Sequence, residues 1–153
     1  MFEIKIISGG QSGVDRAALD FALTNDIKCG GFCPKGRLAE DGRIDEKYPL
    51  TETLSTLYQE RTRLNAEQGD AMLVIYEKAL GRGTKLAIDI AEKSGKAILL
   101  AKLPSNKTLI DETILWLKKT KPLKLNIAGP RESSSKGIYI KAFAFLNEIF
   151  PHD

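Results

Sequence analysis

The sequence predicts a three-layer α/β sandwich, in which helices cover both faces of a mostly parallel sheet of about five strands. Five short runs are rich in apolar residues, and several are almost continuously apolar, as is typical of strands buried on both faces. The stretches between these runs repeat apolar side chains at helical spacing. Regular alternation of strands and helices favours parallel strands joined by right-handed crossovers.

The strands are expected at residues 2–7, 29–32, 71–76, 97–101 and 123–128. The helices are expected at residues 14–23, 53–68, 84–93, 111–119 and 137–150. Gly95 follows the third helix at a C-cap position. In the fourth helix, acidic residues near the start and lysines at the end suit the helix dipole. The polar interval 34–49 has no period, so we expect a functional or mobile loop there.

Length and composition indicate a single domain over residues 1–153. The net charge of +3 is too small to mark a nucleic-acid binder. No apolar run approaches the roughly 20 residues of a membrane helix. Glu3 and Lys5 interrupt the first strand, so no signal segment is expected either. We therefore expect a cytoplasmic protein.

Histidine and cysteine usage excludes several kinds of chemistry. The one histidine, His152, lies next to the C-terminus, which argues against a Ser-His-acid or Cys-His hydrolase. Cys29 and Cys33 are too few to form a structural zinc site and are interpreted as reduced, mostly buried thiols. No metal ligands and no catalytic residues are therefore assigned. Trp116 and the phenylalanines of the C-terminal helix are expected in the core or in a subunit contact.

The turn after the first strand is the most informative motif. Residues 8–13 read SGGQSG and lie between a strand and a helix. Glycines allow the backbone to approach a ligand, and the free N–H groups of a helix's first turn attract anions. The turn therefore predicts a site for a phosphate or another anion. A tight turn that needs glycine only for its geometry is the alternative.

Three other polar clusters follow predicted strands, and the carboxyl ends of parallel strands share one edge of the sheet. They are residues 34–43, 80–84 and 129–137. In the second cluster Thr84 is a candidate helix cap, and in the third Arg131 is a candidate phosphate ligand. Each cluster alone is equally compatible with a solvated loop. The residues expected at the ligand are Gly9, Gly10, Gln11, Ser12, Gly13, Asp15, Arg16, Lys35, Gly36, Arg37, Gly81, Gly83, Thr84, Gly129, Pro130, Arg131, Glu132 and Ser133.

Two further interpretations were weighed against this site. A dinucleotide fingerprint would need a glycine where Ser8 stands and an acidic residue about 20 positions later, where Cys33 and Pro34 are found. Arg61, Arg63 and Asn65 lie on a predicted helix and are interpreted as a solvated face, with Asn65 near enough to the helix end to reach a ligand.

Several motifs together resemble the molybdenum carrier family. They are SGGQSGVDRAALDFAL, CGGFCPKGRLAEDGRI with YPL after it, ERTRLNAEQGDAMLVI, GRGT and LNIAGPRESSSKGI, and they run over nearly the whole chain. That family is regarded as a circularly permuted relative of the YpsA proteins within a superfamily that includes lysine-decarboxylase-like and DprA-like proteins. The resemblance implies a Rossmann-like fold, binding of molybdenum cofactor or a nucleotide, and self-association into a dimer or tetramer.

One difference from related enzymes bears on activity. The phosphoribohydrolases of the superfamily carry a PGGxGTxxE motif with a catalytic glutamate, whereas Leu80 and Ala87 stand at two of these positions here. Without that carboxylate, hydrolysis would need another one, with Asp15, Glu40 and Asp41 as candidates.

The leading hypothesis is a carrier of an anionic, phosphate-bearing small molecule, such as molybdenum cofactor or a nucleotide. A nucleotide-cleaving hydrolase and a DprA-type nucleic-acid-binding module are the alternatives. The small charge and the lack of an aromatic ladder argue against the last of these.

Overall fold

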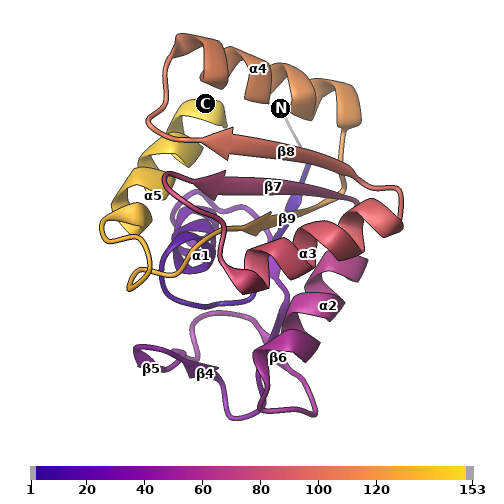
Figure 1. Cartoon of the computed structure of the whole chain (residues 1–153), viewed down its shortest axis with the longest axis vertical. Coiled ribbons are helices and arrows are strands. Elements are labelled where there is room, and N and C mark those ends of the chain that lie inside the picture. The colour runs from indigo at the N-terminus through magenta and orange to yellow at the C-terminus, as the bar shows by residue number, and fades with distance from the viewer. Residues whose placement is uncertain (1–2, 151–153) are drawn as a thin grey trace.

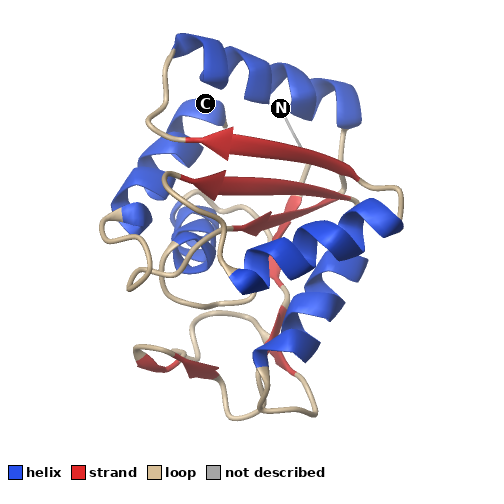
Figure 2. Cartoon of the chain, in the orientation of Figure 1, coloured by secondary structure: helices blue, strands red, loops and turns tan. Residues whose placement is uncertain are grey.

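The computed structural model describes residues 3–150. Its centre is a parallel five-stranded sheet in the order β2-β1-β9-β7-β8. Five helices flank the sheet (Figures 1 and 2). The strands are β1 (Lys5–Ile7), β2 (Cys29–Gly30), β7 (Ala71–Tyr76), β8 (Ala97–Lys102) and β9 (Lys124–Ala128). The helices are α1 (Val14–Thr24), α2 (Tyr58–Gln68), α3 (Arg82–Lys93), α4 (Lys107–Thr120) and α5 (Ile138–Ile149). The predicted fold class is confirmed.

Side chains of the central strand β7 alternate between the two faces of the sheet. Leu73 and Ile75 belong to the larger core, with residues of α1, α4 and α5. Met72 and Val74 belong to the smaller core, with Ala66 of α2 and residues of α3. The strand is thus buried on both faces, which explains its unbroken apolar sequence.

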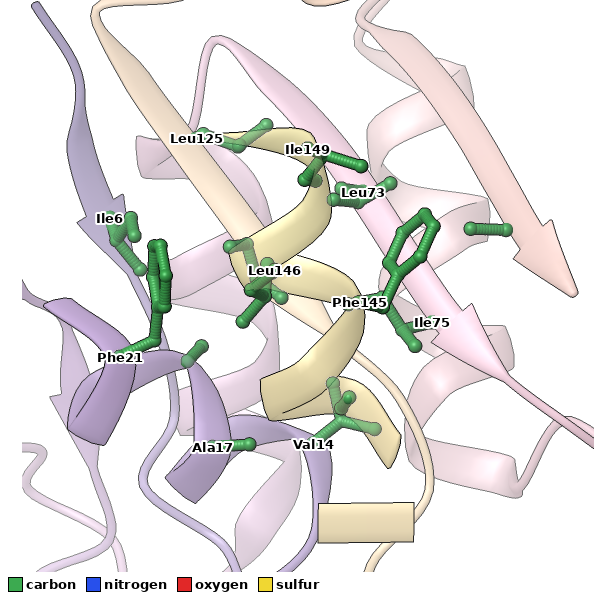
Figure 3. Close-up of a cluster of buried hydrophobic side chains, with 14 of the residues drawn as sticks. Ile6, Val14, Ala17, Phe21, Leu73, Ile75, Leu125, Phe145, Leu146 and Ile149 are labelled. Carbon is green, nitrogen blue, oxygen red and sulfur yellow. The ribbon is translucent and has the colours of Figure 1, made fainter. Parts of the chain in front are cut away.

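The larger core is built around aromatic side chains of two neighbouring helices (Figure 3). Phe21 of α1 and Phe145 of α5 are each 1% exposed. Phe21 also contacts the rings of Phe143 and Phe150. Truncating a buried phenylalanine costs about 3–5 kcal/mol. The aromatic residues of α5 are therefore core residues, as the sequence predicts, and Trp116 of α4 packs against the same core.

Several predicted helix boundaries were wrong. The second helix begins at Tyr58, five residues later than predicted, and α4 begins four residues earlier, at Lys107. Asn106 caps α4 through a hydrogen bond from the N–H of Leu109, and the first turn of α4 holds no acidic residue. A polar N-cap, rather than the acidic residues farther along, marks where this helix starts.

The segment between β2 and α2 is ordered by small strands. A parallel pair joins β3 (Phe32–Cys33) to β6 (Thr51–Glu52), and β4 (Leu38–Ala39) and β5 (Gly42–Arg43) form a hairpin. We call residues 34–52 the lower loop. Cys33 is buried and Cys29 is partly buried, and both are free thiols, as predicted.

A membrane-spanning helix must be long and apolar enough to cross a bilayer. No helix within residues 3–150 has the length and apolar composition needed to cross one. Two positions discussed above lie outside the described residues. They are His152 and residue 2, where the first strand was expected to begin.

Candidate binding cavity

A cavity of about 680 Å³ opens at the carboxyl edge of the sheet. This volume is in the range of small-molecule sites. Segments after β1, β7 and β9 form the cavity together with one face of α2. The lining residues include Gly9, Gln11, Asp15, Tyr58, Arg61, Asn65, Lys78, Leu80, Gly81, Arg82, Gly83, Thr84, Ala87, Asn126, Gly129, Pro130, Arg131 and Ser134. Three of the four polar clusters singled out in the sequence therefore meet here.

Glycines allow the loops after β1 and β9 to touch. A Cβ on Gly13, whose φ is +81°, would lie 2.4 Å from the carbonyl oxygen of Pro130. A Cβ on Gly129 would lie 2.1 Å from the carbonyl oxygen of Ile75. No side chain fits at these distances, so both glycines serve close backbone packing. This packing is the geometric alternative that the sequence left open for the first turn.

Several backbone N–H groups in and after the first turn donate within the protein. That of Gly10 donates to Ser8 Oγ, and that of Ser12 donates to Gln11 Oε1. The N–H of Val14 donates to the carbonyl oxygen of Pro130, and the backbone of Gln11 lies near the carboxylate of Asp15 and lowers its pKa. A carboxylate of the chain therefore occupies the place that the sequence suggested for a ligand anion.

Asp15 and Arg61 form a nearly buried pair in the cavity wall. Arg61 Nη1 lies 3.7 Å from Asp15 Oδ2, and the two side chains are 10% and 13% exposed, respectively. The same nitrogen donates to the carbonyl oxygen of Gly9, and the guanidinium lies over the ring of Tyr58. Burial raises the pKa of Asp15 to about 6, against the opposing effects of Arg61, the Gln11 N–H and Arg16.

The start of α3 forms the basic end of the cavity. The helix begins at Arg82 after Gly81, and no side chain caps it. Thr84, the predicted cap, is instead a buried residue of the first turn and lines the cavity. Lys78 and Arg82 also line the cavity, and neither has an ion-pair partner within residues 3–150. Free N–H groups, the helix dipole and two cations together favour an anion.

Glu40 of the lower loop joins the first turn to the loop after β9. Its carboxylate accepts hydrogen bonds from the Ser12 hydroxyl and from both the N–H and the hydroxyl of Ser133. Burial raises the pKa of Glu40, but these bonds and the charge of Arg131, 3.9 Å away, outweigh it and hold the pKa below its ordinary value. Glu40 thus pairs with Arg131, which lines the cavity.

Several predicted ligand residues do not line the cavity. Arg16 donates to the carbonyl oxygen of Gly10 and pairs with Asp41. Arg37 is buried and donates to four carbonyl oxygens of the lower loop, those of Ile44, Asp45, Tyr48 and Leu50. Glu132 accepts from the N–H groups of Gly137 and Tyr139 at the start of α5. Gly10, Ser12, Gly13, Lys35, Gly36 and Ser133 also lie outside the lining.

Sequence reasoning missed the contribution of α2. The predicted solvated face holds for Arg63, which is exposed and pairs with Glu60 and Glu67. It is wrong for Arg61 and Asn65, which are buried. Asn65 exchanges two hydrogen bonds with the backbone of Phe32. The four-residue spacing of Arg61 and Asn65 puts them on one helix face and was the available signal.

Lys78 and Asn126 are two further lining residues that sequence reasoning did not single out. Asn126 lies within β9 in an otherwise apolar run and is only 4% exposed. A polar amide inside an otherwise apolar strand was the available signal for Asn126, because buried polar groups need partners.

Comparisons with known proteins agree with this architecture. The sequence profile of the circularly permuted YpsA SLOG family matches residues 6–150. The chain belongs to this family. The family resemblance expected from the motifs is confirmed. Among curated proteins, none matches the chain.

The structure of one relative has been solved and is similar to that of this chain. It is a protein from Syntrophus aciditrophicus SB described as a "Putative molybdenum carrier protein". The two chains are 40% identical, the match covers 97% of this chain and 96% of that one, and the TM-score is 0.90. The likeness therefore extends over the sheet and both helical layers.

Proposed function

We propose that this family member binds a phosphate-bearing small anion in the cavity and acts as its carrier. The observation that carries the proposal is the uncapped start of α3, which opens into the cavity beside Lys78 and Arg82. The phosphate would lie there, rather than in the turn after β1, because the carboxylate of Asp15 already stands in the first turn of α1.

Molybdenum cofactor and nucleotides are the ligands that we propose. The solved relative is described as a molybdenum carrier, and both ligand types carry a phosphate and a flat, hydrogen-bonding ring. The cavity offers cations for the phosphate, and the nearly buried Asp15 and buried Asn126 for the ring. This donor set fits the organic part and the phosphate of such a cofactor.

Binding without hydrolysis is the proposed activity. Ala87, at the position of the related hydrolases' glutamate, is buried and lines the cavity. Its methyl group can neither donate nor accept a proton.

We also propose that the protein is cytoplasmic and self-associates. Exposed Leu54 and Leu57, just before α2, would supply apolar contact area, and light scattering in solution measures the resulting mass.

The test is calorimetric titration of the purified protein with GMP and AMP. Removing two cations with Lys78→Ala and Arg82→Ala should weaken binding roughly tenfold or more, since each charge-assisted hydrogen bond to phosphate is lost. Lys93→Ala, at the far end of α3 and exposed, is the matched control and should leave affinity unchanged. If neither nucleotide binds, or if the double variant binds both as tightly as wild type, the proposal fails.

A further inference from the structure

The cavity contains one feature that an anion site does not require. Among the described residues that line it, Asp15 is the only carboxylate, and it faces a space bordered by Arg61, Lys78, Arg82 and Arg131. A buried negative charge repels a phosphate placed near it. Asp15 must therefore serve another part of the ligand or serve only the fold.

The hydrogen-bonding capacity of Asp15 is not used up by the chain. Its carboxylate has about four acceptor positions. The backbone N–H of Gln11 takes at most one of them, and Arg61, at 3.7 Å, is an ion pair beyond ordinary hydrogen-bond distance. The side chain is 13% exposed and lines the cavity. Acceptor positions are therefore open to a ligand that brings N–H donors.

The sheet separates this carboxylate from the basic end of the cavity. α1 and α3 begin at the carboxyl ends of β1 and β7, and β9 lies between these strands. Adjacent strands are about 4.8 Å apart, so the carboxyl ends of β1 and β7 are separated by roughly 10 Å. Asn126, Ala128 and Gly129 of the intervening segment also line the cavity. This arrangement suits a ligand with an N–H edge at one end and a phosphate at the other.

We propose that Asp15 is a specificity-determining residue that accepts two hydrogen bonds from the 2-amino-4-oxopyrimidine edge of a guanine or pterin phosphate. That edge presents a ring N–H beside an exocyclic amino group, the donor pair that one carboxylate accepts. Adenine presents a ring acceptor at the equivalent position, which a carboxylate repels. The inference rests on the proposed function, because it assumes that the phosphate lies at the start of α3.

Calorimetric titrations of the wild-type chain with GMP, IMP and AMP test the inference directly. The three nucleotides share one phosphate and differ only in the ring, and IMP lacks only the amino group of GMP. Losing one hydrogen bond to a charged group should weaken IMP roughly tenfold to a hundredfold relative to GMP, and AMP further still. A parallel titration with 6-hydroxymethylpterin phosphate shows which of the two ring systems binds more tightly.

The outcomes separate this inference from the proposed function. Equal affinities for GMP and AMP overturn the role of Asp15 and leave a phosphate-binding carrier. No binding of any of these phosphates overturns both. Because the comparison uses only wild-type protein, it does not depend on the folding of a variant.

A reciprocal substitution supplies the second arm. Asp15→Asn offers one acceptor and one donor, which match the edge of xanthine and not that of guanine. The variant should lose GMP affinity roughly tenfold to a hundredfold and gain affinity for XMP, with inorganic phosphate bound as by wild type. Asp89→Asn, on α3 and exposed, is the matched control. Unchanged GMP affinity in Asp15→Asn would contradict the proposal.

Discussion

Asp15 is held in a setting that disfavours its charge. The carboxylate is nearly buried, and Arg61, its ion-pair partner in the cavity wall, lies 3.7 Å away. Burial raises its pKa from 3.8 to about 6, although Arg61, the Gln11 N–H and Arg16 act in the opposite direction. A ligand that donates to this carboxylate would offset the cost of its ionisation.

The raised pKa predicts how stability depends on pH. Since the folded chain holds this proton more tightly than the unfolded chain, the proton's stabilising contribution is complete below pH 4 and is lost as pH rises through about 6. The change in pKa from 3.8 to about 6 corresponds to about 3 kcal/mol of stability. Asp15→Asn has no such proton. Urea denaturation from pH 4.5 to 8 should show the free energy of unfolding of the variant rising relative to wild type with pH, whereas parallel curves would contradict the assignment.

At individual residues, sequence reasoning located the loops of the site but not the directions of their side chains. Gly13 and Gly129 were identified as turn glycines, yet the partners that require them, the carbonyls of Pro130 and Ile75, come from distant segments. Arg131 was identified and does line the cavity. Arg37 was expected there as well, because a loop cation facing a ligand and one facing carbonyl groups are identical in sequence.

The lower loop is the element that the sequence described least well. It has no helical or strand period, and its order comes from Arg37, which is 5% exposed and donates to four carbonyl oxygens. Glu40 and Asp41 then attach the loop to the first turn and to Arg16. Long-range hydrogen bonds of this kind leave no local pattern in a sequence.

Arg37→Lys should lower the free energy of unfolding by about 2–4 kcal/mol, because an ammonium group cannot replace the planar fork of donors. Amide hydrogen exchange in residues 34–50 should accelerate. Arg43→Lys, in the same loop and exposed, is the control and should change little.

The same variant also tests whether Arg37 contacts ligand. GMP affinity of folded Arg37→Lys should equal that of wild type, because Arg37 does not line the cavity. A large loss of GMP affinity, with the fold intact, would instead place Arg37 at the ligand, as its sequence context first suggested.

The start of α3 shows how one helix boundary changes the chemistry of the cavity. The expected start of α3 at Thr84 would have supplied a capped helix, whereas the observed start at Arg82 leaves the first turn uncapped. The wrong start predicted for α2 did not affect Arg61 and Asn65, which share one face of the helix in either case. Periodicity identified both helices, but the packing of α2 against α3 determines which side chains reach the cavity.

For the whole molecule, the pattern of apolar runs was enough to predict the layers. The five strands of the sheet and the five helices occur in the predicted order. Strands buried on both faces need nearly continuous apolar runs, and these runs are visible in the sequence. The strand order puts the carboxyl ends of β1, β9 and β7 side by side and creates the cavity. The lower loop, expected at the same site, reaches the neighbouring loops through Glu40 but contributes no lining residue to the cavity.

The most direct test of the central claim is an NMR titration of ¹⁵N-labelled protein with GMP. If the phosphate lies at the start of α3, the amide signals of Gly81, Gly83 and Thr84 should shift strongly, together with those around Asp15. Signals of residues 35–37 should stay in place. Shifts confined to residues 35–37, or no shifts at the cavity at saturating GMP, would contradict the account.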